Sequence, residues 1–286
     1  EFIWTKMLDK DGVLHRSHFD GINDVEGELD DYAQMARGYL FVHDATGDKV
    51  WLDRAKTLLA QMRKNFQDTE TGDFFGTREA AGFARTKPRS DVDQPSGNGA
   101  ALDAMVRLAQ RAGTPDMRRA TEQTIAALSG IAAGTPTSGA SILSASDSFL
   151  HGQTGVLQFA GNGVVTARLV AGADRKSLVI RLQVADGWHV NSHAPLEDYL
   201  VATKLDIAGN AAAKAAAVSY PEPETKKLAF NETPMALLEN QVEITARFDE
   251  PVTGPVEARL QIQTCSDEIC LLPETLKLRL ALPPAS

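Results

Sequence analysis

The sequence has only two cysteines among its 286 residues, no long apolar run and no excess of positive charge. A structural zinc site usually takes four cysteine or histidine ligands, and there is no second cysteine pair to complete one. The formal net charge of −9 argues against a phosphate-binding surface, so we expect no nucleic-acid partner. No stretch of about 18 or more apolar residues occurs, so we expect no membrane segment in this chain.

The sequence also lacks an initiator methionine and a basic-then-apolar leader at its start. Residues 1–8 are typical of the last turns of an amphipathic helix, so we interpret the chain as a piece of a longer protein. A targeting signal could lie in the missing part. The lack of a leader therefore does not indicate a cytoplasmic location.

Residues 1–135 have the apolar spacing of amphipathic helices. We expect Asp30 or Asp31 to cap the first of them and Asp48 to begin the second. Ser96 is expected to cap a third helix, and a Thr-Pro pair at 114–115 the fourth. Two helical hairpins in succession predict an α/α-hairpin array, which four helices do not close by themselves.

Residues 136–163 are rich in Gly, Ala, Ser and Thr, which predicts a linker with a short strand near its end. Beyond it the apolar period changes from that of a helix to that of a strand. Alternating apolar residues and Pro/Gly turns over residues 164–286 predict at least six strands in an antiparallel sandwich. The predicted organisation is two domains, α then β.

The cysteine pair is the chemically distinctive feature of the chain. Cys265 and Cys270 follow a predicted strand, and they could form a redox-active disulfide, form a structural bridge or remain inert thiols. As a staple, a loop of about six residues contributes only about 2 kcal/mol. Asp267 and Glu268 disfavour a thiolate, so we infer a disulfide attacked by a partner's thiolate. The alternation places Cys265 at an edge that a partner could reach.

Four motifs in the β half carry a family resemblance. They are residues 186–193 (DGWHVNSH), 220–223 (YPEP), 227–232 (KLAFNE) and 265–274 (CSDEICLLPE). In these motifs the chain resembles the N-terminal, periplasmic domain of the thiol:disulfide interchange protein DsbD, from about residue 164 to 282. The resemblance implies an immunoglobulin-like sandwich. Its cysteine pair would receive electrons from a thioredoxin-like domain and pass them to a periplasmic thiol protein.

The resemblance also implies residues around the two sulfurs. In that family a cap loop with an aromatic residue covers the disulfide, and Phe230, Asn231 and Glu232 occupy the matching place. His189 and Asn191 stand where relatives carry tyrosines beside the sulfurs, a departure that bears on the tuning of the site and on its partner. A periplasmic or otherwise extracytoplasmic location follows, as it does for an exchangeable disulfide in general. No cofactor is implied.

The helical half carries a second resemblance, in residues 14–17 (LHRS), 27–33 (GELDDYA), 71–77 (TGDFFGT) and 94–101 (QPSGNGAA). It looks like the latter part of the YyaL family, also called spermatogenesis-associated thioredoxin-domain proteins. These proteins join a thioredoxin-like domain to a helical toroid related to six-hairpin glycosidases. The resemblance implies a partial toroid, and it makes the thioredoxin-like domain of the same parent protein a candidate partner.

Carboxylates before two predicted helices suggest a site in this half. Asp30 and Asp31, with Glu28, precede one of these helices, and Asp91, with Asp93, precedes the other. Such paired carboxylates could serve glycoside chemistry at the mouth of a toroid, and Ser96 and Asn98 belong to the same candidate site. The alternative is that they are helix caps and dipole partners. Two other functions therefore remain open: a sugar-binding or sugar-processing toroid with an accessory sandwich, or an interaction scaffold with a structural disulfide.

Histidines offer little evidence for a metal site. His189 and His193 are four residues apart, which would suit a metal only on a helix, and they follow a predicted strand. We interpret them as polar loop residues and expect no metal. Trp188, beside them, is expected to fill the core of the sandwich.

Overall fold

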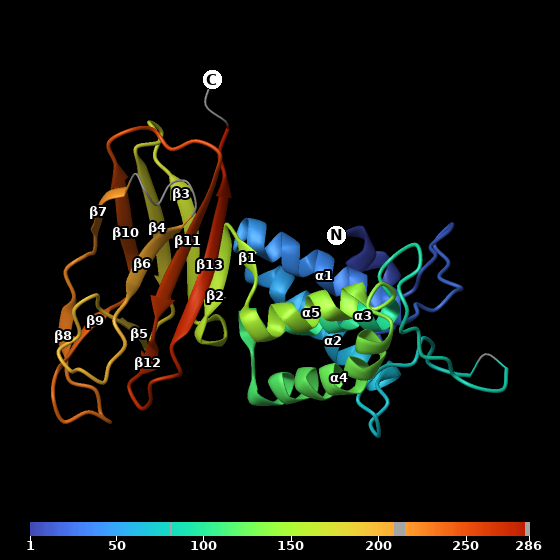
Figure 1. Ribbon diagram of the computed structural model, residues 1–286. Helices are drawn as coiled ribbons and strands as arrows, with labels where there is room; N and C mark the ends of the chain where they lie inside the picture. Colours follow the sequence, from blue (N-terminus) through green and yellow to red (C-terminus); the bar gives the residue numbers. More distant parts are fainter. Residues whose placement is uncertain (81, 209–214, 284–286) are drawn as a thin grey trace. The chain divides into compact units, whose positions relative to one another are not determined.

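The computed structural model describes residues 1–80, 82–208 and 215–283 (Figure 1). The chain divides into a helical unit, residues 1–109 and 113–151, and a β unit, residues 110–112 and 152–286. The predicted order, α then β, is confirmed. Within the described ranges, no helix has the length and apolar character needed to cross a bilayer.

The helical unit begins with a short π-helix, η1 (Ile3–Met7), and continues with five α-helices in the described residues. They are α1 (Leu29–Thr46), α2 (Lys49–Phe66), α3 (Gly97–Ala112), α4 (Pro115–Gly134) and α5 (Ala140–His151). Helices α1 and α2 pack against each other, as the predicted hairpin requires. Helices α3, α4 and α5 share a second cluster, in which Leu102, Leu128 and Ile142 are buried.

The helix starts follow local capping chemistry, with one difference from the prediction. The Asp48 carboxylate accepts the Val50 N–H, and the Ser96 hydroxyl accepts the Gly99 N–H, so both residues cap as predicted. Helix α1 instead begins at Glu28, in a capping box where the Asp31 carboxylate accepts the Glu28 N–H at 2.8 Å. The predicted cap was wrong because the acidic residue of a capping box lies three positions inside the helix.

The segment 136–163 is more ordered than its composition predicts. It contains α5, two short strands, β1 (Thr154–Gly155) and β2 (Leu157–Ala160), and a 3₁₀ turn, η2 (Gly161–Gly163). Ile142 and Ala145 of α5 are buried against α3 and α4. The composition of this segment, rich in small residues, is typical of a linker. A few apolar residues at helical spacing are nevertheless enough to form a helix that packs against α3 and α4.

The β unit contains three sheets. The first has the order β1-β13-β11-β6, with β13 (Glu274–Ala281), β11 (Pro255–Ile262) and β6 (Lys204–Ala208). The second has the order β2-β3-β4-β10-β7, with β3 (Val165–Ala171), β4 (Ser177–Val184), β10 (Gln241–Phe248) and β7 (Ala215–Ser219). The third has the order β12-β5-β9-β8, with β12 (Thr264–Ser266), β5 (Trp188–Asn191), β9 (Met235–Leu238) and β8 (Glu224–Lys226).

Alternate residues of the first and second sheets form one core, as the period of two predicts. Ile180 stands opposite Ile244 in the antiparallel pairing of β4 with β10, and both are fully buried. Leu260 of β11 and Leu278 of β13 enter the same core from the first sheet. Each buried side chain of this size contributes about 2 kcal/mol. The sandwich is thus stabilised independently of any bridge, and Trp188 packs against its core as predicted.

Candidate functional site

The two cysteines form a disulfide within the third sheet. The Cys265 and Cys270 sulfurs are 2.02 Å apart, and the two Cα atoms are 3.9 Å apart. Cys265 lies in β12, and Cys270 returns opposite it in an isolated bridge. The turn between them is closed by the Ser266 N–H, which donates to the Ile269 carbonyl at 2.8 Å. Residues 265–270 are called the cysteine loop below.

The two sulfurs differ in burial. Cys265 is 0% exposed and lies in a cluster with Leu200, Leu228, Met235 and Leu237. Cys270 packs against this cluster and is partly exposed. The prediction of an accessible Cys265 was therefore wrong. Strand β12 is at the end of its sheet, but it belongs to a different sheet from β11, so the alternation of β11 does not continue through it.

The cap segment, residues 227–232, lies on the cysteine loop. Its Ala229 N–H donates to the Asp267 carbonyl at 3.2 Å. Leu228 is 4% exposed and contacts the cysteine cluster, whereas Phe230 is 40% exposed. The Asn231 side chain accepts a hydrogen bond from the Tyr199 hydroxyl at 3.0 Å.

Two features of the cap segment were not predicted. Leu228 was missed although it lies in the KLAFNE motif, because its burial depends on the fold. Tyr199 has no signal in the sequence that links it to the cap segment. Glu232, which the resemblance places in the cap, is exposed.

Asn191 borders the buried sulfur. Its side chain is fully buried in β5, and its Nδ2 atom donates to the Val201 carbonyl at 3.1 Å and to Gln263 Oε1 at 3.0 Å. These bonds leave its Oδ1 atom facing the Cys265 sulfur at 4.0 Å. A disulfide sulfur has no hydrogen to donate, but a Cys265 thiol could donate weakly to this oxygen.

His189 lies in β5 and is buried, so the interpretation as a polar loop residue was wrong. Its Nε2 atom is 3.0 Å from Asp267 Oδ1. Its Nδ1 atom is 2.7 Å from Glu239 Oε1, close enough for an ion pair but without hydrogen-bond alignment. Lys226 Nζ donates to Glu239 Oε2 at 2.5 Å, and this bond raises the lysine's pKa. These four residues are called the His189 cluster.

The His189 cluster could not be assembled from the sequence. Asp267 was noted as a neighbour of the cysteines, but Lys226 ends β8 and Glu239 directly follows β9. No local pattern joins them to His189. The pairing of β5 with β12 and β9, and of β9 with β8, brings their side chains together.

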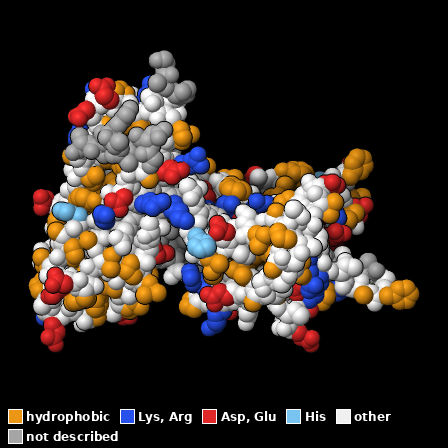
Figure 2. Space-filling model, in the orientation of Figure 1, with side chains coloured by type: hydrophobic (Ala, Val, Ile, Leu, Met, Phe, Trp, Pro, Cys, Tyr) orange, Lys and Arg blue, Asp and Glu red, His pale blue; other side chains and the backbone are white. Residues whose placement is uncertain are grey.

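Exposed apolar side chains lie in the cysteine loop and next to it. Ile269 and Leu272, on either side of Cys270, are 51% and 85% exposed, and Tyr199 is 64% exposed. Figure 2 shows hydrophobic side chains on the surface near the end of the sandwich where β8, β9 and β12 lie in Figure 1. Exposed apolar groups gathered at one place often mark a contact surface.

The helical residues predicted for a toroid site make structural contacts. Asp91 Oδ1 accepts from the Ser96 N–H at 2.8 Å and from the Ser141 hydroxyl at 2.6 Å. Burial alone would raise the pKa of Asp91, but these hydrogen bonds hold that pKa below its usual range. Asn98 bonds both backbone groups of Phe74, at 2.8 Å each.

The acidic pair of the predicted toroid site lies in the first turn of α1. Asp30 is partly exposed there. Burial raises the pKa of Asp31, whose carboxylate takes part in the capping box and pairs with Arg16. These contacts agree with the alternative interpretation as helix-end residues, and the glycoside site stays a prediction.

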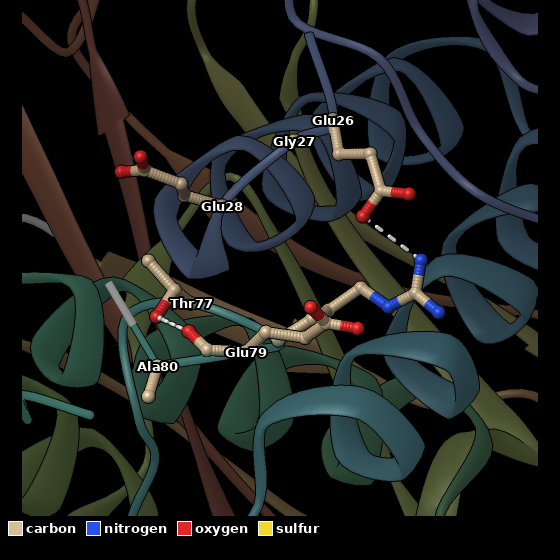
Figure 3. Close-up of a pocket in the computed structure, with 7 residues that line it drawn as sticks. Glu26, Gly27, Glu28, Thr77, Glu79 and Ala80 are labelled. Atoms are coloured by element: carbon tan, nitrogen blue, oxygen red, sulfur yellow. Dashed lines mark hydrogen bonds and ion pairs between the residues drawn. The ribbon is translucent and has the colours of Figure 1, made fainter. Parts of the chain in front are cut away.

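A cavity of about 350 Å³ opens elsewhere in the helical unit. Its lining residues are Glu26, Gly27, Glu28, Thr77, Arg78, Glu79 and Ala80. Figure 3 shows the Glu26 carboxylate in its ion pair with Arg78, at 2.9 Å, with Glu28 pointing away. Of the residues considered for a toroid site, Glu28 lines this cavity, whereas Asp30, Asp31, Asp91, Ser96 and Asn98 do not. Over the described ranges, no group of three or more acidic, histidine or cysteine side chains is arranged to hold a metal.

Comparison with known families matches the β unit. Residues 164–282 match the family described as thiol:disulfide interchange protein DsbD, N-terminal. This agrees with the resemblance in the four motifs and with an immunoglobulin-like sandwich after a helical half. A search of curated proteins gave no match.

Solved structures similar to the chain include domains of this type. The reduced N-terminal domain of DsbD from Neisseria meningitidis is 16% identical, covers 41% of this chain and 85% of its own, and has a TM-score of 0.32. The N-terminal periplasmic domain of ScsB from Proteus mirabilis is 17% identical, with a TM-score of 0.31. The match covers 42% of this chain and 47% of that one. A complex of the N. meningitidis DsbD and PilB N-terminal domains includes a chain that is 15% identical. The match covers 42% of this chain and 84% of that one, with a TM-score of 0.32.

Proposed function

We propose that the β unit is a thiol–disulfide exchange module in which a thioredoxin-like partner reduces the Cys265–Cys270 bond. The observation that carries the proposal is the unequal burial of the two sulfurs, in a domain that matches the DsbD N-terminal family. Cys270 is partly exposed, whereas Cys265 is fully buried. An incoming thiolate therefore meets Cys270 first, and Cys265 is the leaving group.

The exchange proceeds in two balanced steps. The partner's thiolate bonds to the Cys270 sulfur, the Cys265–Cys270 bond breaks, and its electron pair leaves on Cys265 as a thiolate. The partner's second thiolate then attacks its own sulfur in the mixed disulfide and releases Cys270. The partner ends as a disulfide, and the two cysteines end as thiols after taking two protons from solvent. The reverse sequence passes the electrons to a periplasmic thiol protein.

The surroundings of Cys270 suit a protein partner. Ile269 and Leu272 offer exposed apolar contacts directly beside the reacting sulfur. Phe230 and Leu228 belong to a cap segment tied to the cysteine loop by a single described backbone bond, Ala229 to Asp267. A partner that displaces this segment would uncover the bridge. The thioredoxin-like domain of the same parent protein is our candidate, and the location is periplasmic.

A purely structural bridge fits these features less well. A bridge closing about six residues contributes only about 2 kcal/mol, and the sandwich already has a core formed by two sheets. A staple also gains nothing from an accessible sulfur beside exposed apolar groups. The scaffold alternative therefore lacks a supporting observation.

The test uses the two single-cysteine variants of the whole chain. Cys265→Ser leaves Cys270 as the free thiol, and Cys270→Ser leaves Cys265. Each is mixed with a thioredoxin whose attacking cysteine carries a thionitrobenzoate group, and release of that group is followed by absorbance. We expect Cys265→Ser to react at least about tenfold faster, because thiol reactivity depends on access.

A matched control removes the fold. In denaturant the two variants should react at similar rates, since burial no longer distinguishes the sulfurs. Equal rates in the native chain would overturn the assignment of Cys270. A wild-type bridge that reduced thioredoxin cleaves only under denaturing conditions would overturn the proposed function itself.

A further inference from the structure

His189 stands directly opposite Cys265 in the antiparallel pairing of β5 with β12. Opposite residues of such a pair project from the same face of the sheet, with Cβ atoms about 5 Å apart. The His189 side chain is 7% exposed, and Cys265 is 0% exposed. A charge on the ring would therefore act on the sulfur with little screening by water.

Carboxylates face both nitrogens of the ring. Asp267 Oδ1 is 3.0 Å from Nε2, and Glu239 Oε1 is 2.7 Å from Nδ1. A neutral imidazole has one N–H group, whereas an imidazolium has two. An arrangement with an acceptor at each nitrogen therefore suits the protonated ring.

The ring proton offsets part of a carboxylate excess around His189. In the described part of the chain, Glu239 and Asp267 lie against the ring, and Lys226 pairs with both Glu239 and Glu224. Three carboxylates then face one ammonium and one imidazolium. Loss of the ring proton makes this net charge more negative beside Cys265, which disfavours a thiolate there.

We infer that protonated His189 is a positioning residue for disulfide cleavage, whose charge stabilises the Cys265 thiolate as it leaves. This inference rests on the proposed exchange function. As the partner's sulfur bonds to Cys270, the electron pair of the broken bond collects on Cys265, beside the imidazolium. No proton moves in this step, and the thiolate takes its proton from solvent afterwards. Asp267 and Glu239 hold the ring in place through their contacts at its two nitrogens.

The experiment measures reduction of the intact chain by dithiothreitol at roughly pH 5 to 9, across the range in which histidine changes charge. Free thiols are trapped and counted over time, and each rate constant is divided by the fraction of reductant present as thiolate. For the wild type we expect this normalised constant to fall as pH rises. In His189→Gln it should be flat and, at the acidic end, about tenfold lower, the effect of losing one nearby charge.

Two further variants separate charge from structure. Asp267→Asn keeps a side chain of the same shape but removes the carboxylate that lies 3.0 Å from Nε2, so the dependence of the normalised rate constant on pH should differ from that of the wild type. His193→Gln is the matched control, because His193 is an exposed histidine of the same motif that stacks on Tyr220. It should retain the wild-type profile.

The outcomes distinguish the two proposals. If the wild type is reduced in its native state but His189→Gln gives the same falling profile, the role of His189 is overturned and the exchange function stands. If the native wild type resists reduction at every pH, the exchange function fails and this inference fails with it. A displaced profile in Asp267→Asn, with normal circular dichroism, would support the role of charge.

Discussion

The two units each bury a cluster of charged side chains, and the clusters differ in how fully their members are bonded. In the helical unit the Asp73 side chain is fully buried and accepts bonds from Thr71 at 2.5 Å, Lys87 at 2.7 Å and Arg89 at 2.7 Å. In the β unit, His189 approaches Glu239 without an aligned bond, and the Asp267 side chain is 70% exposed.

This difference indicates different roles. The Asp73 cluster surrounds one carboxylate with two permanent cations and joins residues 68–73 to residues 87–89. The His189 cluster depends on a proton that can leave, and it lies beside a disulfide. A fully bonded cluster holds a loop in place, whereas an incompletely bonded cluster next to a breakable bond can respond to its chemistry.

The largest effect should come from removing the buried carboxylate of the structural cluster. Asp73→Ala leaves Arg89 partly buried without this carboxylate and takes one acceptor from Lys87, which keeps its bond to Asp68. We expect the free energy of unfolding of the helical unit to fall by about 3 kcal/mol. Urea unfolding followed by far-UV circular dichroism would measure it. The control is Asp116→Ala, which breaks an exposed pair with Arg63 and should change nothing measurable. A loss no greater than the control's would contradict the structural role of Asp73.

Removing the disulfide should have a smaller effect, confined to the β unit. A double variant, Cys265→Ala with Cys270→Ala, is expected to lower the unfolding free energy of that unit by about 2 kcal/mol and to leave it folded. Hydrogen–deuterium exchange measured by mass spectrometry would report each unit separately. If the double variant lost protection from exchange throughout the first and second sheets, the disulfide would instead be a structural bridge.

Acid should weaken the Asp73 cluster gradually. The Lys87 bond lowers the pKa of Asp68 to about 2. Burial opposes the shift at Asp73, but bonds from Lys87, Thr71 and Arg89 outweigh it and lower that pKa too. Carboxyls of this kind stabilise the folded state fully above their ordinary pKa near 4, and the stabilisation is lost as pH falls toward about 2.

The measurement is the unfolding free energy of the helical unit at several pH values in this window. Lys87→Gln removes the cation that both carboxylates share, so its stability should depend less steeply on pH between about pH 4 and pH 2. Identical slopes in the variant and the wild type would show that the acid response arises elsewhere. The disulfide chemistry of the β unit should be unaffected by this variant.

Much of the fold was predictable because its signals are local. The caps at Asp48 and Ser96 depend on backbone groups within three residues, and the alternation of Leu178 to Val184 depends only on the pleat of one strand. Helix α5 was missed because its small residues resemble a linker until α3 and α4 are present. The start of α1 was misplaced because Asp31, the acidic residue of the capping box, lies three positions inside the helix from the Glu28 cap.

The candidate site divides in the same way. The sequence by itself determined that the only cysteines lie five positions apart, close enough to bridge, and that four motifs resemble one family of exchange domains. Only the tertiary structure decided which cysteine is buried. Strand β12 belongs to a different sheet from β11, so the Cys265 side chain points into an apolar cluster formed by other segments. It also decided that Glu239 and Lys226 meet His189, since side chains distant in the sequence become neighbours only through strand pairing.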